Sequence, residues 1–283
     1  MPIAHPERLM SQHVLAYAYY KNGQVDKAIE LLEQVIKIRE GVLPIAHYSR
    51  LVAQSELAAM YQHELGHTYL QTGREEDAMK LLEQVVKIQK EILPIDNHRR
   101  LMSQHELARA YVTDGQVEKA IQLLEPVVKI KEGILPVAHR TRLISQQVLA
   151  RAYHKNGQVD KAIEPLVHVV KTREEVLPVA NSERLHSEHE LAYRYLDKGG
   201  LVSEAIELLE QVVKVREEVL GVTQVERLAS QHDLARAYYA NGQVGSAIEL
   251  MEHVVKIKEE VLPATDPGRL KSEQELARYK EKV

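Results

Sequence analysis

Residues 100–136 read RLMSQHELARAYVTDGQVEKAIQLLEPVVKIKEGILP, and close copies of this stretch fill most of the chain. An Arg-Leu pair opens each copy, with successive spacings of 42, 50, 42, 42, 43 and 42 residues, at Arg8, Arg50, Arg100, Arg142, Arg184, Arg227 and Arg269. A fixed period in this range is typical of repeat arrays, in which each unit buries its apolar face against its neighbours. The sequence therefore predicts six repeats and a final half repeat.

Each repeat predicts two helices joined by a short turn. In residues 101–112 the apolar side chains recur at three- and four-residue spacing, which places them on one face of a helix. This first helix, helix A, ends at Asp114-Gly115, because glycine accepts the left-handed conformation that closes a helix. The second, helix B, begins near Val117 and ends at Leu135-Pro136, because a residue before proline is driven out of the helical region. The predicted fold is an all-α solenoid.

Two repeated patterns, R-L-x-S-Q-H-x-L-A-R-A-Y and N-G-Q-V-x-K-A-I-E-L-L-E, resemble the tetratricopeptide repeat. Counted from Leu101 as position 1, the small and large positions of that family fall on Leu107, Ala108, Tyr111, Ala120 and Leu124. The long repeat with Leu-Pro between units resembles the kinesin light chain type. The near-identity of the repeats is similar to C-terminal arrays of fungal NLR-like NTPases.

The resemblance implies a right-handed α-solenoid that binds a protein segment in its concave groove, as the sensing or scaffolding part of a larger protein. We expect a single domain over residues 1–283. Its predicted parts are a polar terminal helix at 264–283 and six hairpins at 1–44, 45–94, 95–136, 137–178, 179–221 and 222–263.

Composition excludes several function classes. The chain has no Cys, which excludes disulfides and thiol nucleophiles and favours a cytoplasmic protein. Lys plus Arg number 37 against 41 for Asp plus Glu, a balance that does not favour nucleic acid or an anionic membrane as partner. No apolar run approaches the roughly 18 residues of a membrane span, and no phosphate-binding glycine motif is present. We expect no cofactor.

One motif could carry chemistry. Residues 63–67 read HELGH, which matches the zincin pattern H-E-x-x-H, with two zinc-binding histidines on one helix face and a glutamate as general base. The same place in other repeats reads HELAR at 105–109 and HELAY at 189–193, so a single change to His67 generates the motif. No third ligand stands at the expected spacing downstream, and Gly73 ends the helix. We therefore predict no catalytic or metal residue here and no enzyme, with a zinc metalloprotease-like site as the least favoured alternative.

The resemblance implies that positions 2, 5, 9 and 12 of helix A line the groove. Read onto this chain, these positions gather Arg, His and Tyr on one surface, which suits an acidic peptide or protein segment whose binding weakens with salt. The candidate groove residues are His13, Tyr17, Tyr20, His63, His67, His105, Arg109, Arg151, His154, His189, Tyr193, His232, Arg236 and Tyr239. In the alternative interpretation, each fifth-position His bonds to the neighbouring repeat and each Arg pairs with a nearby Glu, as Arg109 could with Glu106.

Some features favour a structural role. The Arg of each Arg-Leu pair and the Ser-Gln that follows recur unchanged, which is what repeated packing requires. Eight extra residues in the second repeat predict a longer, protruding helix or a local break, and Pro126 and Pro165 predict bends in helix B. No capping helix precedes the first hairpin, so we expect an upstream domain or another copy of the chain to cover its exposed face. Self-assembly through that face is the alternative function.

Overall fold

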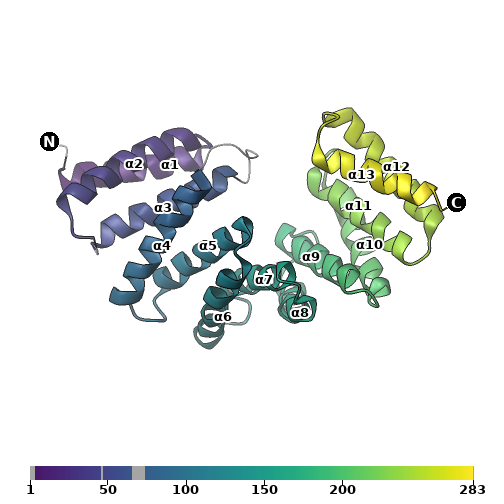
Figure 1. Ribbon diagram of the computed structural model, residues 1–283, viewed down its shortest axis with the longest axis horizontal. Helices are drawn as coiled ribbons and strands as arrows, with labels where there is room; N and C mark the ends of the chain where they lie inside the picture. The colour runs from purple at the N-terminus through teal and green to yellow at the C-terminus, as the bar shows by residue number, and fades with distance from the viewer. Residues whose placement is uncertain (1–3, 46, 66–73, 283) are drawn as a thin grey trace. The chain divides into compact units, whose positions relative to one another are not determined.

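The structure is a computed structural model that describes residues 4–45, 47–65 and 74–282. The described residues form helices and no strands, so the predicted all-α fold is confirmed. The chain divides into two compact units, Met1–Leu135 and Pro136–Val283. Both units are built from helical hairpins (Figure 1). None of the described helices is long and apolar enough to cross a membrane.

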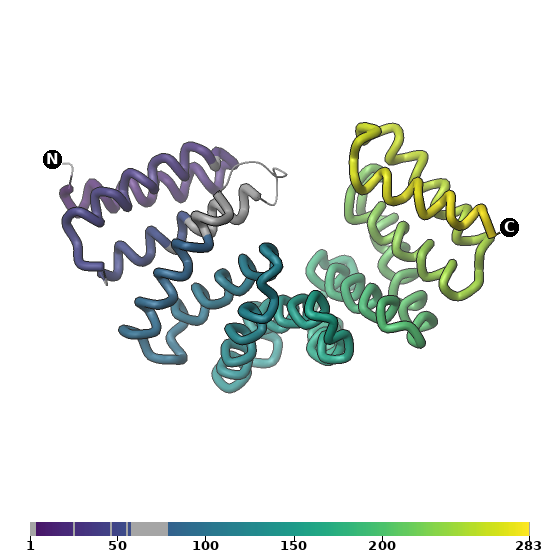
Figure 2. The backbone as a smooth tube through the Cα atoms, in the orientation of Figure 1, coloured from purple at the N-terminus to yellow at the C-terminus, as the bar shows by residue number. Residues whose placement is uncertain are grey.

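The first unit holds three hairpins in which helix A and helix B alternate. In chain order the helices are α1 (Pro6–Lys21), α2 (Val25–Val42), α3 (Tyr48–Leu65), α4 (Arg74–Ile92), α5 (His98–Asp114) and α6 (Val117–Ile134). From α1 to α6, each helix packs against its neighbours along the chain within this unit. The backbone trace shows the same succession of antiparallel pairs (Figure 2).

The second unit continues the pattern of hairpins and ends with one further helix that is not part of a hairpin. Its helices are α7 (Arg140–Lys155), α8 (Val159–Val176), α9 (Ser182–Lys198), α10 (Val202–Val219), α11 (Val225–Ala240), α12 (Val244–Val261) and α13 (Pro267–Lys280). The last helix packs against α12, where Tyr279 is fully buried and its ring stacks on Tyr239 at 4.1 Å between ring centroids. Helix α13 therefore occupies the place that helix A takes in a complete repeat.

The helix boundaries have local causes. Asn97 caps α5, since its side-chain oxygen accepts hydrogen bonds from the backbone N–H groups of Arg99 and Arg100 at 3.0 and 3.4 Å. The same helix ends at Gly115, whose φ of 84° is left-handed, as the sequence predicts. Helix α6 ends at Leu135, which is extended before Pro136.

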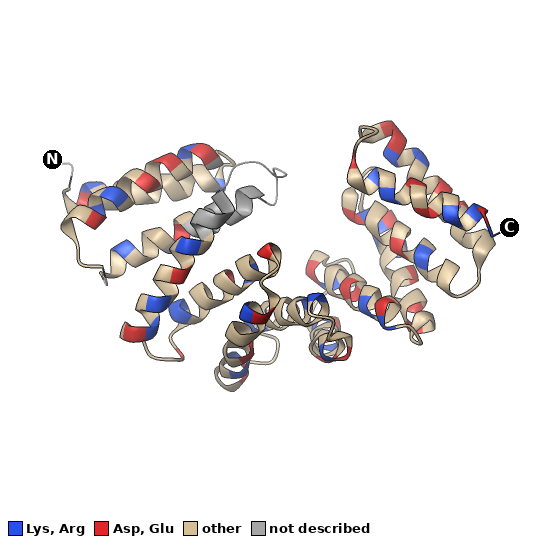
Figure 3. Ribbon diagram, viewed as in Figure 1, with Lys and Arg blue, Asp and Glu red and all other residues tan. Residues whose placement is uncertain are grey.

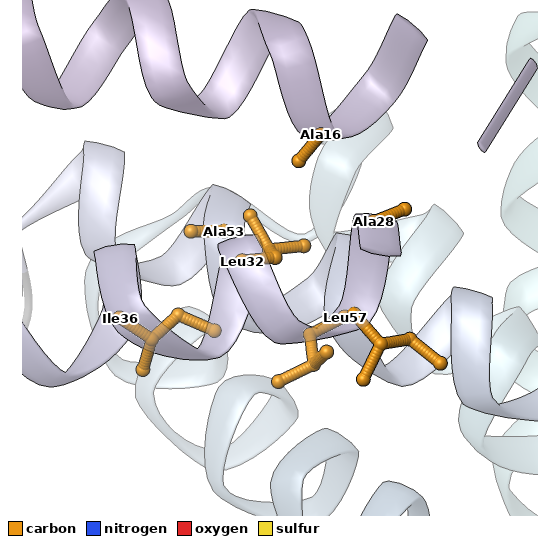
Figure 4. Close-up of a cluster of buried hydrophobic side chains, with 7 residues drawn as sticks. Ala16, Ala28, Leu32, Ile36, Ala53 and Leu57 are labelled. Carbon is orange, nitrogen blue, oxygen red and sulfur yellow. The ribbon is translucent and has the colours of Figure 1, made fainter. Parts of the chain in front are cut away.

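Successive repeats are joined through apolar contacts between helix B and the next helix A. In the first core cluster, Leu32 of α2 is fully buried among Ala16 of α1 and Ala53 and Leu57 of α3 (Figure 4). Small residues at the alanine positions let the helix backbones approach closely, and the leucines fill the space between them. Full burial of such a leucine contributes roughly 2 kcal/mol.

The recurrent arginine binds the end of the preceding helix B. Arg100 Nη1 donates to the carbonyls of Leu93 at 2.8 Å and Lys90 at 3.3 Å, and Arg227 Nη1 donates to that of Leu220 at 3.1 Å. These carbonyls lie where a helix leaves its last acceptors without intrahelical donors. The structural role predicted for the Arg-Leu pair is confirmed, and the serines that follow are buried at Ser103, Ser145, Ser187, Ser230 and Ser272.

A buried cation on helix B makes a second link between repeats. Arg173 Nη1 donates to the carbonyl of Glu183 at 2.8 Å, and Arg216 Nη1 donates to the carbonyl of Glu226 at 2.7 Å. In both cases the acceptor lies in the first turn of the following helix A. Arg173 and Arg216 are only 2% and 4% exposed, so each buried charge depends on the next repeat for its hydrogen bonds.

The irregular second repeat packs in the register of its first Arg-Leu pair. Counted from Leu51, Ala53 and Leu57 of α3 are buried in the first core cluster. Helix α3 is continuous from Tyr48 to Leu65, so it has no break where the second helix start begins at Met60. Residues 66–73 lie outside the described residues, and the longer, protruding helix stays a prediction. Helices α6 and α8 continue through Pro126 and Pro165, and the bends stay a prediction.

Candidate functional site

The fifth-position histidines of helix A are mostly buried between repeats. His13, His105 and His232 are 9%, 7% and 6% exposed. Burial lowers the pKa of His105 to about 3, with the charges of Lys131 and Arg109 acting in the same direction. Burial also lowers the pKa of His232 to about 4. Both imidazoles are therefore neutral at pH 7.

An acidic residue at position 6 of the next helix A faces the fifth-position histidines His13, His189 and His232. His189 Nε2 donates to Asp233 Oδ2 at 3.0 Å, and His13 Nε2 is hydrogen-bonded to Glu56. His232 Nε2 lies 3.5 Å from Glu275 Oε2. The sequence alternative in which the fifth-position histidine bonds to the neighbouring repeat is therefore the observed one at these sites.

The same acidic residues also pair with the ninth-position arginines. Arg151 Nε lies 3.3 Å from Glu190 Oε1, while Arg236 Nε lies 3.7 Å from Glu275 Oε1. Arg236 also donates to Asp233 of its own helix at 3.0 Å. We call these sixth-position carboxylates the acid ladder: Glu56, Glu190, Asp233 and Glu275.

Asp233 of the acid ladder is held in its charged form by its partners. Burial would raise the pKa of Asp233, but the hydrogen bond from His189 and the positive charge of Arg236 hold it below its usual value. Arg151 and Arg236, two of the arginines predicted to attract an acidic ligand, are thus already paired with carboxylates of the acid ladder. Figure 3 shows cationic and anionic residues interspersed along the helices of each unit.

The remaining predicted residues differ in exposure. In the first unit Tyr17 is 48% exposed, and Arg109 pairs with Glu106 within its own helix at 3.0 Å. Tyr20 is partly buried and packs against the first core cluster. Among the predicted groove residues of this unit whose side chains the structure describes, Tyr17 and Arg109 are therefore the most exposed.

In the second unit the predicted aromatic and twelfth-position residues are partly covered. His154 Nε2 lies 2.6 Å from Asp197 Oδ2 of the next repeat. The guanidinium of Arg236 lies 5.2 Å from the ring centroid of Tyr193, a cation–π distance. Tyr239 is stacked on Tyr279. These contacts hold neighbouring helices A together. A smaller part of each side chain is therefore accessible to a ligand than the sequence pattern predicts.

The prediction that the HELGH segment at residues 63–67 forms no metal site is not tested by the structure. The side chains of His63, Glu64 and His67 lie outside the described residues, so the structure does not test the zincin pattern. Among the residues it does describe, no group of three or more His, Cys, Asp or Glu is placed to hold a metal ion.

A shallow cavity of about 230 Å³ lies within the second unit. Arg140, Ile144 and Gln147 of α7 line one side, and Glu183 and His186 of α9 line the other. Arg173 of α8 contributes to it from between the two helices A. Sequence reasoning did not select this site, because it depends on how the side chains of three consecutive helices pack together in space.

Sequence reasoning also missed the acid ladder. A signal was present, since the members of the acid ladder and Glu106 all stand at position 6, whereas Val14 and Val148 stand there in the first and fourth repeats. The period alone could not show that this residue reaches back to the previous repeat.

Comparison with known proteins identifies the repeat. Sequence models of the tetratricopeptide repeat match residues 56–133 and 184–260, and another model of the same repeat matches residues 8–48. Nothing among the curated proteins matches the chain.

Solved structures show the same fold. The nearly identical TPR-like repeats of a kinesin light chain-type protein from Podosopora anserina are 48% identical, with a TM-score of 0.65, over 77% of this chain and 99% of that one. BtubC (BKLC) from P. vanneervenii is 15% identical, with a TM-score of 0.62, over 91% of this chain and 95% of that one. A Rap protein complexed with competence and sporulation factor is 12% identical, with a TM-score of 0.58, over 96% of this chain and 74% of that one.

Proposed function

The chain belongs to the tetratricopeptide-repeat family, and from this premise we propose that it is a non-enzymatic interaction module. Its helix A surfaces bind a peptide or protein segment with acidic residues. The proposed setting is cytoplasmic, where the array serves as the sensing or scaffolding part of a larger protein. No nucleic acid or membrane is part of this proposal.

Exposed contact residues on helix A of the first unit carry the proposal. Met10, Tyr17 and Met102 stand at positions 2 and 9 of their helices and are 57%, 48% and 47% exposed. Large apolar and aromatic side chains supply most of the contact area when a protein binds a peptide. Arg109, on the same helix as Met102, adds a cation that pairs with Glu106 of its own helix.

The acidic character of the ligand has narrower support than the sequence pattern indicates. Arg151 and Arg236 already pair with the acid ladder, so an acidic ligand would have to compete with internal carboxylates there. Arg109 has an exposed side chain and a partly exposed partner, which makes its ion pair weak and open to exchange. The Rap protein complexed with competence and sporulation factor shows only that another protein of this fold binds a ligand.

A peptide selection tests the proposal. The intact chain is used to select random 12-residue peptides by display, and enriched peptides are measured by calorimetry at two salt concentrations. The test variant changes Met10, Tyr17 and Met102 to Ser, and we expect it to lose at least roughly tenfold in affinity.

A matched control removes equal apolar surface elsewhere in the same unit. It changes Val42, Ile92 and Ile134 to Ser, three residues near the ends of helices B that are 53%, 46% and 49% exposed. The control should bind like the wild type. Failure to enrich any peptide, or equal loss in both variants, would refute binding on helix A. Affinity that does not fall with salt would refute the acidic ligand.

A second candidate function, self-assembly, is favoured by the face of α1. Leu15 at position 7 is 45% exposed, whereas its equivalents Leu57, Leu191 and Leu234 are 5%, 4% and 4% exposed beneath the preceding helix B. Val14 beside it is 60% exposed. We propose that another copy of the chain covers this face, with an upstream domain as the other occupant.

Sedimentation across a hundredfold range of protein concentration tests self-assembly. We expect the wild type to associate and Leu15→Glu to stay monomeric, since a charge cannot be buried in an apolar contact without a partner. A wild type that is monomeric throughout would leave an upstream domain as the remaining occupant of the face.

A further inference from the structure

The cavity between α7 and α9 carries a surplus of positive charge. Arg140 and Arg173 both contact one carboxylate, that of Glu183: Arg140 Nε lies 2.7 Å from Oε1, and Arg173 Nη2 lies 3.4 Å from Oε2. Two guanidiniums thus contact the same carboxylate, and the charge of Glu190 also acts on Arg173. Burial lowers the pKa of His186 at the rim, so this imidazole is neutral at pH 7 and adds no charge.

The two arginines have unused hydrogen-bonding capacity. The contact of Arg140 with Glu183 involves Nε, and its side chain is 72% exposed, so the side chain stays accessible to a ligand from solvent. Arg173 is 2% exposed, and its Nε has no acceptor among the described residues. A buried cationic donor without an acceptor is costly, and an oxygen ligand that reaches it recovers part of that cost.

Arg140 differs in its charge balance from Arg236. Arg140 shares the carboxylate of Glu183 with Arg173, whereas Arg236 lies beside two carboxylates of the acid ladder, Asp233 and Glu275. At the place of Arg140, the next two repeats carry Ser182 and Val225, so this arginine is not a recurring part of the packing. An arginine that packing does not require, beside a cavity, is a candidate for ligand contact.

We propose that the cavity between α7 and α9 binds a carboxylate, with the Nη groups of Arg140 as its main donors and Ile144 as the apolar wall beside it. The fork of N–H groups on a guanidinium matches the two oxygens of a carboxylate. This inference rests on the proposed function, because the carboxylate belongs to the bound segment. It is either an acidic side chain or the end of the peptide chain.

Two small probes test the site without a known peptide. The protein, labelled with ¹⁵N at arginine, is titrated with N-acetylglutamate α-amide, which carries only the side-chain carboxylate, and with N-acetylglycine, which carries only the terminal one. N-acetylglutamine amide is the neutral control. We expect a saturable shift of the Arg140 Nε–H resonance with a carboxylate probe, and the tighter probe identifies the source of the group.

Two variants have opposite expected effects. Arg140→Gln should weaken probe binding by roughly tenfold or more, since a charge-assisted hydrogen bond is lost. Glu183→Gln should tighten binding by about threefold or more, because it removes the internal carboxylate that competes for both arginines. A folding defect would not tighten binding. Arg99→Gln, at an exposed arginine of the first unit that is not a candidate groove residue, is the matched control and should bind within about twofold of the wild type.

The outcomes separate this site from the proposed function. No saturable shift in the wild type, unchanged binding in Arg140→Gln, or weaker binding in Glu183→Gln would each overturn the carboxylate site. If the probes bind at Arg140 but no peptide is enriched in the selection, the site stands and the proposed function fails. If enriched acidic peptides bind Arg140→Gln as tightly as the wild type, this inference alone fails.

Discussion

Replacement of Glu188 by Gln should stabilise the protein at pH 7. Glu188 stands at position 4 of its helix A, where most repeats have Gln, and its side chain is 1% exposed. Arg184 Nε donates to its Oε1 at 2.8 Å, whereas its Oε2 has no hydrogen-bond partner. Burial raises the pKa of this carboxyl, the bond from Arg184 opposes the rise, and the charge of Glu174 adds to it.

Other repeats show what the glutamine would do. Gln54 Nε2 donates to Glu40 Oε1 at 3.1 Å, and Gln231 Nε2 donates to Glu217 Oε1 at 2.7 Å. The residue at the same offset from Glu188 is Glu174. The substitution therefore replaces a repulsion with a hydrogen bond to a carboxylate, and its carbonyl oxygen still accepts from Arg184.

The expected gain is the difference between two hydrogen-bond terms. A hydrogen bond to a charged acceptor contributes about 2 kcal/mol. The loss of charge in the bond from Arg184 costs about 1 kcal/mol, so the free energy of unfolding should rise by about 1 kcal/mol. Because the folded-state pKa of Glu188 is raised, its ionisation destabilises the fold above that pKa. This penalty disappears as the pH falls below the unfolded value, and the gain should shrink toward pH 4.

Urea unfolding followed by circular dichroism at pH 7 and pH 4 measures this effect. The matched control is Glu190→Gln, two residues away on the same helix. Glu190 is 8% exposed and lies 3.3 Å from Arg151 and 3.4 Å from Arg194. Its neutralisation leaves the buried Arg194 uncompensated and should cost about 3 kcal/mol. A loss of stability in Glu188→Gln at pH 7 would refute the reasoning, because the ion pair with Arg184 would then outweigh the repulsion.

Three further outcomes are expected. Because the pKa of His232 is lowered to about 4, acidification from pH 7 to pH 5 should lower the free energy of unfolding by about 2 kcal/mol through this residue. In urea titrations His232→Gln should lose less stability over this pH range than the wild type. An unchanged pH profile of stability in the variant would contradict this. Lys258 Nζ donates to Ser272 Oγ at 2.8 Å, so Lys258→Met should speed amide hydrogen exchange in α13 relative to α11, and equal rates would count against this link. Val14 is 60% exposed, whereas Val148 is 5% exposed. Val14→Glu should therefore change the free energy of unfolding by less than about 0.5 kcal/mol, and Val148→Glu should lower it by at least about 2 kcal/mol. Similar unfolding midpoints for the two variants would refute this difference in stability.

Much of the fold followed from local signals. The period of the Arg-Leu pair, the glycine after helix A and the proline after helix B are each a property of a few neighbouring residues. Backbone conformation at such places depends on local sterics, so Gly115 is left-handed and Leu135 extended as predicted. The register of the second repeat could not be predicted in this way, because two helix starts compete there and contact with Leu32 selects Leu57.

The candidate site was harder to predict than the fold. The sequence showed that His and Arg recur on one face of helix A, and it presented two interpretations, a ligand surface and contacts between repeats. At His189, Arg151 and Arg236 the structure favours contacts between repeats, since acidic partners lie within 4 Å. Whether a charged residue is free or paired depends on a residue some forty positions away, and periodicity contains no such information.

The sequence by itself determined the helical repeat, its boundaries and the structural role of the recurrent arginine, because these depend on turn chemistry and on apolar spacing within one repeat. Only the tertiary structure decided which charges are neutralised, which leucine of α1 stays exposed and where three helices enclose the cavity beside Arg140. Helix packing brings these side chains together from separate repeats, and electrostatic pairing depends on their distances in space.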